Sequence, residues 1–397
     1  MKIIRYTYQF KLNPNEEQQI LLHKYFGSVR WIYNYFLNQR KEEYLNNKKS
    51  LNYYDQAKEL TIIKKQENKL WLKEINSQTL QYSLNCLDIA FQSFFKKRTK
   101  FPKFKSKKNK NSFTIPQFVK VNNNLLIIPK FKEGIKMIVN REISGKIKRC
   151  TITKTSTGKY FVSILVEKEY QPVQKTNKSV GIDLGLKDFI ITSDGLKIKN
   201  HKFLKHYEKL LKINQQSLSR KTTRSNRYEK KRLRVARIYE KISNSRIDLI
   251  HKTTSILIKN YDIIYLEDLN IKGMIKNHKL AKSINDVAWG KFIQILSYKS
   301  IWNDKQIIKI DRFFPSSKTC SKCGWIKNDL TLKDRTWICK CGEKHDRDLN
   351  AATNILKEGI RLNISDGTSD YGCGDQIRPN LLGIIVESSK DKILNIS

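Results

Sequence analysis

Three acidic residues stand where carboxylates can support metal-dependent chemistry. Asp183 lies inside the apolar run SVGIDLG, Glu267 follows the apolar run YDIIYL, and Asp348 directly precedes the segment LNAATNIL. An ionised carboxylate inside a buried strand is destabilising unless a cation or hydrogen bonds compensate its charge. Asp183 and Glu267 are therefore the two acids that a purely structural role explains least well.

The third acid has a structural alternative. An Asp directly before a helix is most often an N-cap, and Asp346 could fill the same role as Asp348. Taken together, a strand Asp, a strand Glu and a helix-start Asp can meet at one edge of a sheet and hold two divalent cations about 4 Å apart. Such a pair positions the water that attacks a phosphodiester and stabilises the leaving 3′ oxygen. Oxygen ligands favour Mg²⁺ or Mn²⁺ at such a site.

A second group of candidate ligands is formed by Cys320 and Cys323, then Cys339 and Cys341, each pair followed by a glycine. Two thiolate pairs separated by 15 residues (324–338) fit a tetrahedral structural zinc site. The second pair is C-x-C where C-x-x-C is usual, and His345 is close enough to replace a ligand, so the fourth ligand stays open. The other three cysteines are isolated, and packing or exposure explains them: Cys86, Cys150 and Cys373.

The charge balance points to a polyanionic partner. The 397 residues include 78 Lys and Arg against 37 Asp and Glu, a net charge of +41. Residues 96–110 contain nine basic and no acidic residues, and residues 220–237 contain nine basic residues and one acid. Either tract could be a solvated surface, and the surplus alone also fits a ribosomal-type RNA binder. The basic residues selected as nucleic-acid contacts are Lys103, Lys105, Lys107, Arg220, Arg224, Arg227, Lys231 and Arg234.

Several functional classes are disfavoured. No stretch reaches the roughly 18 uninterrupted apolar residues of a membrane span, and the first residues contain no long apolar segment typical of a secretion signal. We therefore expect a cytoplasmic protein that uses no membrane. A Gly-rich phosphate loop, a Ser/His/Asp set and a catalytic Cys/His pair are all missing from the sequence, so no other catalytic motif competes with the three acids. A small-molecule substrate is not expected, because such an enzyme has no use for the self-repulsion of a large net charge.

The N-terminal part is expected to combine a sheet with helices. Residues 3–12 alternate as a strand does, and residues 21–36 and 70–95 carry apolar side chains at helical spacing. About five short strands over 112–167 suggest a small antiparallel barrel. The first strand could pair into this barrel, which would make the helical part an insertion.

After the polar linker 171–178 the pattern becomes α/β. It predicts strands at 179–185, 188–192, 196–199, 261–269 and 306–310. It predicts two long helices over 205–259 with a break near 222–226, and helices at 288–300 and 349–359. Residues beyond 360 show no lasting period and are expected to be a loosely ordered tail.

Four ordered motifs resemble the TnpB family of transposon-encoded proteins, relatives of the type V CRISPR effectors. They are GIDLGLKDFI (181–190), IIYLEDLNIKGM (263–274), FFPSSKTCSKCG (313–324) and HDRDLNAATNIL (345–356). The segments WLKEINSQTLQYSLNCLDIAFQSFFKK, FPKFKSKK and SFTIP are similar to the recognition-domain pattern of that family, and CGDQIRP (373–379) is similar to its C-terminal end.

The resemblance implies a multidomain α+β fold. Residues 1–12 and 112–178 would form a wedge-like, OB-like antiparallel β-barrel, with a helical recognition domain at 13–111 inserted in it. Residues 179–315 and 346–361 would form an RNase H-like RuvC nuclease domain, interrupted by a zinc ribbon at 316–345 that binds the target nucleic acid. Residues 362–397 would be a flexible tail.

The resemblance also implies an activity, namely RNA-guided cleavage of double-stranded DNA next to a short transposon-adjacent motif. Asp183, Glu267 and Asp348 match the catalytic triad, with Mg²⁺ or Mn²⁺ at the nuclease site and a structural Zn²⁺. The implied partners are a guide RNA from the transposon end and the DNA target. The sequence leaves the oligomeric state open, and a monomeric ribonucleoprotein is favoured. Flanking DNA would be read by the region containing Tyr53, Tyr54, Ser77 and Gln81. Two alternatives stay open: a nuclease-inactive RNA-guided repressor or homing factor, and, less favoured, a strand-transferring transposase.

Overall fold

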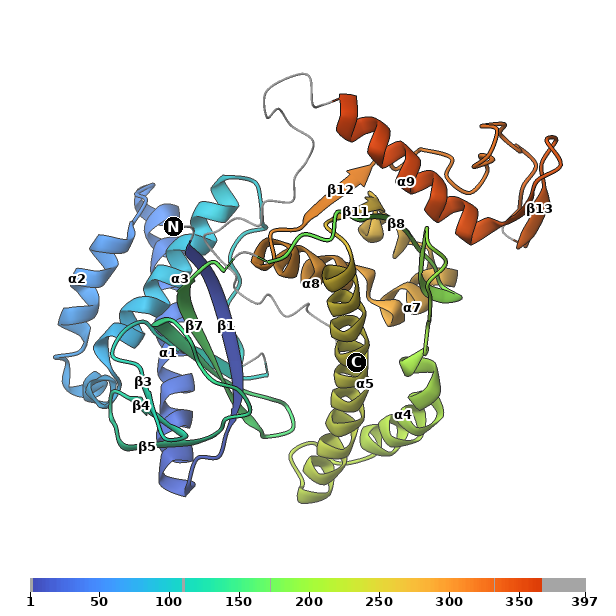
Figure 1. Cartoon of the computed structure of the whole chain (residues 1–397). Coiled ribbons are helices and arrows are strands. Elements are labelled where there is room, and N and C mark those ends of the chain that lie inside the picture. Colours follow the sequence, from blue (N-terminus) through green and yellow to red (C-terminus); the bar gives the residue numbers. More distant parts are fainter. Residues whose placement is uncertain (1–2, 109–110, 172, 332, 366–397) are drawn as a thin grey trace. The chain divides into compact units, whose positions relative to one another are not determined.

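In a computed structural model the chain forms two compact units, residues 1–170 and 171–397 (Figure 1). The structure describes residues 3–108, 111–171, 173–331 and 333–365. The predicted tail from 366 onward, including Cys373 and the CGDQIRP segment, lies outside these residues. Among the described residues no helix is long and apolar enough to cross a membrane. The cytoplasmic location stays a prediction.

The first unit contains a seven-stranded sheet in the order β2-β6-β7-β1-β5-β4-β3. The strand bounds are β1 Ile3–Leu12, β2 Asn111–Ile115, β3 Lys120–Asn122, β4 Leu125–Ile128, β5 Phe131–Ile138, β6 Lys146–Lys154 and β7 Tyr160–Glu169. Strand β1 pairs with β7 over its whole length and with β5 at its end. The prediction that the first strand joins the later ones is therefore confirmed.

The predicted closed barrel is wrong. In the described part of the chain the sheet is open, because β2 and β3 are its two ends and pair only with β6 and β4. The helix that follows β1 packs against β2 and β5 of this open sheet. The rings of Tyr25 and Phe26 lie 4.8 and 5.2 Å from the ring of Phe113 on β2, and Tyr25 also contacts Phe131 on β5.

The helices of this unit come between β1 and β2. They are α1 Glu16–Asn47, α2 Tyr53–Ile63, the 3₁₀ helix η1 Glu67–Glu74 and α3 Ser77–Phe95. The single helix predicted over 70–95 is thus broken at Ile75 and Asn76. The side chain of Asn76 accepts a hydrogen bond from the N–H of Thr79 and begins a new helix there. Helix α2 was not predicted.

The second unit contains a five-stranded sheet in the order β10-β9-β8-β11-β12. Its strands are β8 Ser179–Leu184, β9 Asp188–Thr192, β10 Lys197–Lys199, β11 Ile263–Glu267 and β12 Gln306–Ile310. Strands β8, β11 and β12 are parallel, whereas β9 and β10 are antiparallel to their neighbours. A two-stranded sheet, β13 Thr336–Ile338 and β14 Lys344–Asp346, lies in the cysteine region.

Helices α4 Phe203–Ser219 and α5 Asn226–Asn260 form the predicted pair with its predicted break. They are followed by α6 Ile271–Met274, α7 His278–Val287, α8 Trp289–Trp302 and α9 Arg347–Ser365. Sequence patterning treated α6 and α7 as a polar segment. Helix α9 continues beyond the predicted end at 359, so residues 362–365 of the predicted tail are helical.

Helices cover both faces of this sheet. Ile264 and Leu266 of β11 pack with residues of α5 and α8, whereas Tyr265 packs with Ile355 of α9 on the opposite face. Helix α9 comes very close to the strands, because a Cβ at Gly181 would lie 2.2 Å from the carbonyl oxygen of Ala352. A Cβ at Gly359 would lie 2.1 Å from the ring of Tyr265. Glycine at both positions thus allows α9 to lie directly on β8 and β11.

Candidate nuclease site and cysteine cluster

Strand register brings two of the predicted acids together. In the parallel pair of β8 and β11, Leu266 is opposite Ile182, so Asp183 and Glu267 are the next residues of the two strands. Side chains alternate across a sheet. Because Ile182 and Leu266 face the core under α5 and α8, Asp183 and Glu267 belong to the face that α9 covers.

The third acid comes from the start of α9. The structure there shows which of the two aspartates caps the helix, which the residue pattern alone left open. The Asp346 carboxylate accepts hydrogen bonds from the N–H groups of Asp348 and Leu349, so Asp346 is the N-cap of α9. The other Asp346 oxygen lies 2.7 Å from the ammonium of Lys197. The capping alternative therefore belongs to Asp346, which leaves the Asp348 carboxylate free for other contacts.

The electrostatics show that the three acids share one neighbourhood. Burial, followed by the charges of Glu267 and Asp348, raises the pKa of Asp183 from 3.8 to about 7. Burial also raises the pKa of Glu267. Asp348 is instead held by two guanidinium groups, Arg347 at 2.9 Å and Arg335 at 3.3 Å. A buried carboxylate whose ionisation is opposed by two neighbouring carboxylates is a place where a cation would be stabilising.

Glu267 is connected to the segment that leads into the cysteines. The hydroxyl of Ser316 donates a 2.5 Å hydrogen bond to the Glu267 carboxylate. The side-chain amide of Asn354 donates to the carbonyl oxygens of Ser316 and Thr319, at 2.8 and 2.6 Å. Asn350, one turn earlier on α9, donates to the same Thr319 carbonyl and accepts from the N–H of Ser321.

These contacts make α9 the common support of the acids and the cysteine segment. Asn350 and Asn354 are almost completely buried, at 3% and 4% exposure. Sequence reasoning missed them and Ser316. A usable signal was present, because two asparagines one turn apart in LNAATNIL interrupt an otherwise apolar helix face beside Ala351 and Ile355.

We expect Asn354→Ala to weaken both stability and catalysis. The substitution leaves two buried carbonyl groups with one donor fewer, which costs about 1–3 kcal/mol. If cleavage depends on Glu267, it should fall roughly tenfold because Ser316 loses its anchor, a shift of about 1.4 kcal/mol. Thermal unfolding and plasmid cleavage measure the two effects. Thr353→Ala is the matched control, since the hydroxyl of Thr353 donates to the carbonyl of Leu349 in its own helix. Equal effects of both substitutions would contradict the expectation.

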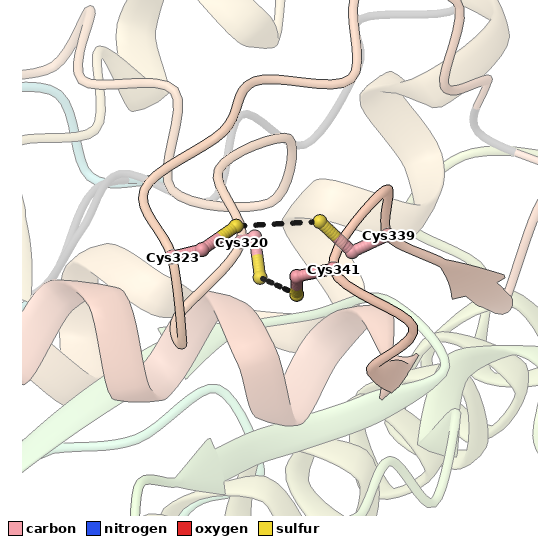
Figure 2. A group of neighbouring side chains, drawn as sticks. All are labelled: Cys320, Cys323, Cys339 and Cys341. Atoms are coloured by element: carbon pink, nitrogen blue, oxygen red, sulfur yellow. Dashed lines mark hydrogen bonds between the residues drawn. The ribbon is translucent and has the colours of Figure 1, made fainter.

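The four cysteines gather at one point (Figure 2). Their sulfur atoms all lie within 4.8 Å of one another, with 3.8 Å between Cys320 and Cys341 and 3.5 Å between Cys323 and Cys339. A tetrahedral zinc with Zn–S bonds of about 2.3 Å holds its sulfurs about 3.8 Å apart. The cluster can thus hold a metal ion, and the short C-x-C pair does not prevent both of its sulfurs from reaching it. Among the described residues, no other group of three or more His, Cys, Asp or Glu side chains is gathered so closely around one point.

His345 lies beside the four sulfurs. It is buried on β14 opposite Trp337, and its Nε2 is 3.0 Å from the Cys320 sulfur. Burial opposes ionisation of Cys320, but hydrogen bonds from the backbone of Cys323 and Lys322 and from His345 lower its pKa to about 6. These contacts favour the thiolate form of Cys320. They fit a role for His345 as a residue that contacts a metal ligand and orients it.

The predicted nucleic-acid residues fall on both units. Tyr53 and Tyr54 begin α2, and Ser77 and Gln81 are exposed one turn apart on α3. Arg227, Lys231 and Arg234 share one face of α5, and Arg220 and Arg224 lie in the turn before it. Lys103, Lys105 and Lys107 are exposed, and the ammonium of Lys105 lies 3.8 Å from the centre of the Tyr33 ring.

Comparison with known proteins places these features in a family. Residues 162–278, which contain Asp183 and Glu267, match the OrfB_IS605 family described as "Probable transposase". Residues 289–355, which contain the four cysteines and Asp348, match the "Cas12f1-like, TNB domain" family, and residues 1–49 match a "Helix-turn-helix domain" family.

Two relatives match along most of the chain. A Streptomyces pristinaespiralis protein named "Putative RNA-guided DNA endonuclease" is 35% identical over 96% of this chain and 93% of its own length. The Escherichia coli (strain K12) protein "Putative RNA-guided DNA endonuclease InsQ" is 31% identical over 94% of each chain. The cryo-EM structure of the Cas12f1-sgRNA-target DNA complex contains a chain of similar fold, with a TM-score of 0.54 and 13% identity over 85% of this chain and 83% of that one.

The fold is thus that of a mixed α/β protein of two units. Its second unit has a group of acids where β8 and β11 end, a helix, α9, that carries the third acid, and a four-cysteine cluster next to the start of that helix. Given the relatives above, the chain belongs to the TnpB (OrfB_IS605) family.

Proposed function

We propose that the chain is an RNA-guided DNA endonuclease. A guide RNA from the transposon end would direct cleavage of double-stranded DNA next to a short transposon-adjacent motif, by a single RuvC-like site. The observation that carries the proposal is the acidic cluster, in which Glu267 and Asp348 help raise the pKa of Asp183 to about 7. The names of relatives that match more than nine-tenths of the chain support it.

In this proposal Asp183, Glu267 and Asp348 are the catalytic carboxylates. Mg²⁺ or Mn²⁺ bound to them would activate the attacking water and stabilise the leaving 3′ oxygen. The chain's own residues orient the acids: Ser316 holds Glu267, Asp346 caps the helix that carries Asp348, and Gly181 allows that helix to approach β8. Arg335 and Arg347, which now hold Asp348, would exchange it for phosphate oxygens of the DNA.

We assign the domains along the same lines. Residues 1–12 and 112–178 would form the wedge-like sheet domain, with the helical recognition domain 13–111 inserted in it. Residues 179–315 and 346–361 would form the RNase H-like RuvC domain. Residues 316–345 would be a target-binding insert with Zn²⁺ on Cys320, Cys323, Cys339 and Cys341, supported by the sulfur spacings. The pairing of β1 with β7 supports the inserted recognition domain.

We place the contacts with nucleic acid at the exposed basic residues. The exposed basic residues of the α4–α5 turn and of residues 103–107 would hold nucleic-acid backbones, and the exposed residues Tyr54, Ser77 and Gln81 would face flanking DNA, with Tyr53 beside them. The protein would act as a monomer with its RNA.

A plasmid assay tests the activity. The purified ribonucleoprotein is incubated with Mg²⁺ and a supercoiled plasmid that carries a target matched to the co-purified RNA. Linear product supports the endonuclease. Unchanged plasmid that is nevertheless bound would favour a repressor or homing factor, a possibility that the ion pairs of Asp348 with Arg335 and Arg347 also fit. Joined donor and target strands would instead indicate a transposase.

We expect the affinity for the guide RNA to depend steeply on salt. A protein that contacts 6–10 phosphates loses about 10³–10⁵-fold in affinity between 50 and 200 mM salt. Changing Arg227, Lys231 and Arg234 together to Gln should reduce the slope of log K against log salt by roughly two. Filter binding at four salt concentrations measures it. Changing Lys252 and Lys259, on the C-terminal half of the same helix, is the control, and a flat salt response of the unmodified protein would contradict the charge argument.

A further inference from the structure

A cavity of about 660 Å³ lies in the first unit where α1 meets η1. Its lining includes Gly27, Trp31 and Tyr35 of α1 and Trp71 and Glu74 of η1. This volume lies within the usual range of small-ligand pockets, about 300–1,000 Å³. The cavity is far in sequence from the acids and the cysteines, and neither site explains it.

Aromatic rings form its walls. Trp31 and Tyr35 stack with 4.9 Å between ring centres and 22° between planes, and Trp71 meets Trp31 edge to face at 5.6 Å. Tyr35 and Trp71 nevertheless remain 37% and 39% exposed. Rings held in place by one another and left open to solvent are a preformed surface on which another flat ring can stack.

Gly27 keeps the cavity open. It lies in the middle of the 32-residue helix α1, where glycine is less stable than alanine. Apart from its chain neighbours and the nearby backbone of its own helix, no heavy atom of the described residues lies within 4 Å of the position that a Cβ would take, so crowding does not require glycine. What glycine does at this position is leave space between the aromatic walls.

The surroundings of the cavity are basic. Lys24 and Arg30 line it, and the Lys69 ammonium lies 5.2 Å from the centre of the Trp31 ring. Glu74 is the one acidic residue among the lining residues that the structure describes. Its carboxylate forms an ion pair with the Lys24 ammonium at 2.5 Å. Asn34, also in the lining, hydrogen bonds to both the N–H and the carbonyl of Lys105, which fixes the basic segment 103–108 next to it.

Aromatic walls, an open floor and a basic rim are the elements of a site for single-stranded nucleic acid. We propose that this cavity receives an unpaired nucleobase, which stacks on the exposed rings of Tyr35 and Trp71 while its phosphate lies among the basic side chains. The inference rests on the proposed function only in taking nucleic acid as the partner. A duplex, whose bases are already stacked, would not use the cavity.

Gly27→Leu tests the inference because it fills the cavity without a backbone clash. In the full-length protein, binding of labelled ten-nucleotide single strands of RNA and of DNA should weaken about five- to tenfold, whereas binding of a ten-base-pair duplex should not change. The strand that loses more affinity, RNA or DNA, identifies the source of the base. Asn46→Leu, which adds the same side chain at an exposed position of α1 outside the cavity, should change neither.

A ligand change gives a second, independent readout. A ten-unit abasic DNA strand keeps the phosphates but has no bases, so its affinity should be equally low for the unmodified protein and for Gly27→Leu. Unchanged affinity of Gly27→Leu for normal single strands, with an unchanged melting temperature, would overturn the proposal. The two proposals are tested separately. If the unmodified protein does not cleave the plasmid, the proposed nuclease activity is wrong, whereas the proposed base-binding cavity is tested by single-strand binding, which needs no cleavage.

Discussion

Replacing Asp183 by Asn should abolish detectable cleavage while leaving RNA binding intact. The residue is isosteric, so the packing under α9 is kept, but one charge of the acidic cluster is lost. Loss of about 4 kcal/mol of transition-state stabilisation, the order of magnitude expected for a disrupted metal site, corresponds to about a thousandfold lower rate. Single-turnover plasmid cleavage with saturating ribonucleoprotein measures it.

Asp346→Asn is the matched control for this substitution. Asn caps a helix about as well as Asp, so the start of α9 should persist, and the change removes a comparable charge only a few residues from Asp348. Cleavage should fall little. If Asp346→Asn were as inactive as Asp183→Asn, the assignment of Asp348 as the third acid would be wrong.

The Asp183 substitution also predicts a pH effect on metal-free stability. The folded-state pKa of Asp183 is raised to about 7 from 3.8, so the folded protein binds this proton more tightly than the unfolded chain does. Stability is therefore lost as pH rises from about 4 to 7, by up to about 4 kcal/mol. Thermal unfolding in buffer without Mg²⁺ and without a chelator, which leaves the cysteine site undisturbed, should show Asp183→Asn more stable than the unmodified protein at pH 8. Mg²⁺ should narrow the difference, because a cation compensates the ionised carboxylates.

Replacing Cys339 by Ser should remove the zinc and disable the nuclease. Structural zinc sites contribute folding energy directly, so the region of β13 and β14 should lose its order. The loss should reach the acids, because Cys320 follows Thr319, whose carbonyl is held by Asn350 and Asn354 beside Ser316 and Glu267. We expect zinc content to fall from one to zero per chain and cleavage to fall roughly 100-fold, the upper range for disturbing a site through its supporting contacts.

Three further variants make this result specific. Cys341→Ser should lose zinc like Cys339→Ser. His345→Ala should keep it with about 10–100-fold weaker affinity, because we expect His345 to contact the ligand Cys320 rather than to bind the metal itself. Cys86→Ser, at an isolated cysteine of the first unit, should change neither zinc content nor cleavage. Zinc is measured by elemental analysis. Full zinc content in Cys341→Ser together with none in His345→Ala would make His345 the fourth ligand.

Local patterns predicted most regular elements well. The strands at 3–12, 188–192 and 306–310 have the predicted bounds, because period-two alternation and flanking turn residues act over a few neighbours. The closed barrel failed for a different reason. The order of the strands in the sheet is set by long-range packing, such as that of Tyr25 and Phe26 against Phe113 on β2, and Phe113 lies almost 90 residues later in the chain.

For the candidate site, the residue order was sufficient to propose three acids and four thiols, because the acids in their local contexts, the spacing of the cysteine pairs and the family motifs can all be read from the sequence. The order could not show which aspartate caps α9, that the short C-x-C pair reaches the other two sulfurs, or that Asn354 and Ser316 support Glu267. Nor could it show that Gly27 lies beside Trp71 in an open cavity.

The amino-acid sequence by itself therefore indicates the kinds of site in this protein. Its surplus of positive charge indicates nucleic-acid binding, its acids indicate a divalent-cation site, and its cysteines indicate a zinc site. Which of these groups meet, and at what distance, is decided only by folding. Register between β8 and β11, the approach of α9 over Gly181, and hydrogen bonds between residues far apart in the chain depend on long-range packing. A single sequence contains no direct record of such contacts, because each one depends on every element between its two partners.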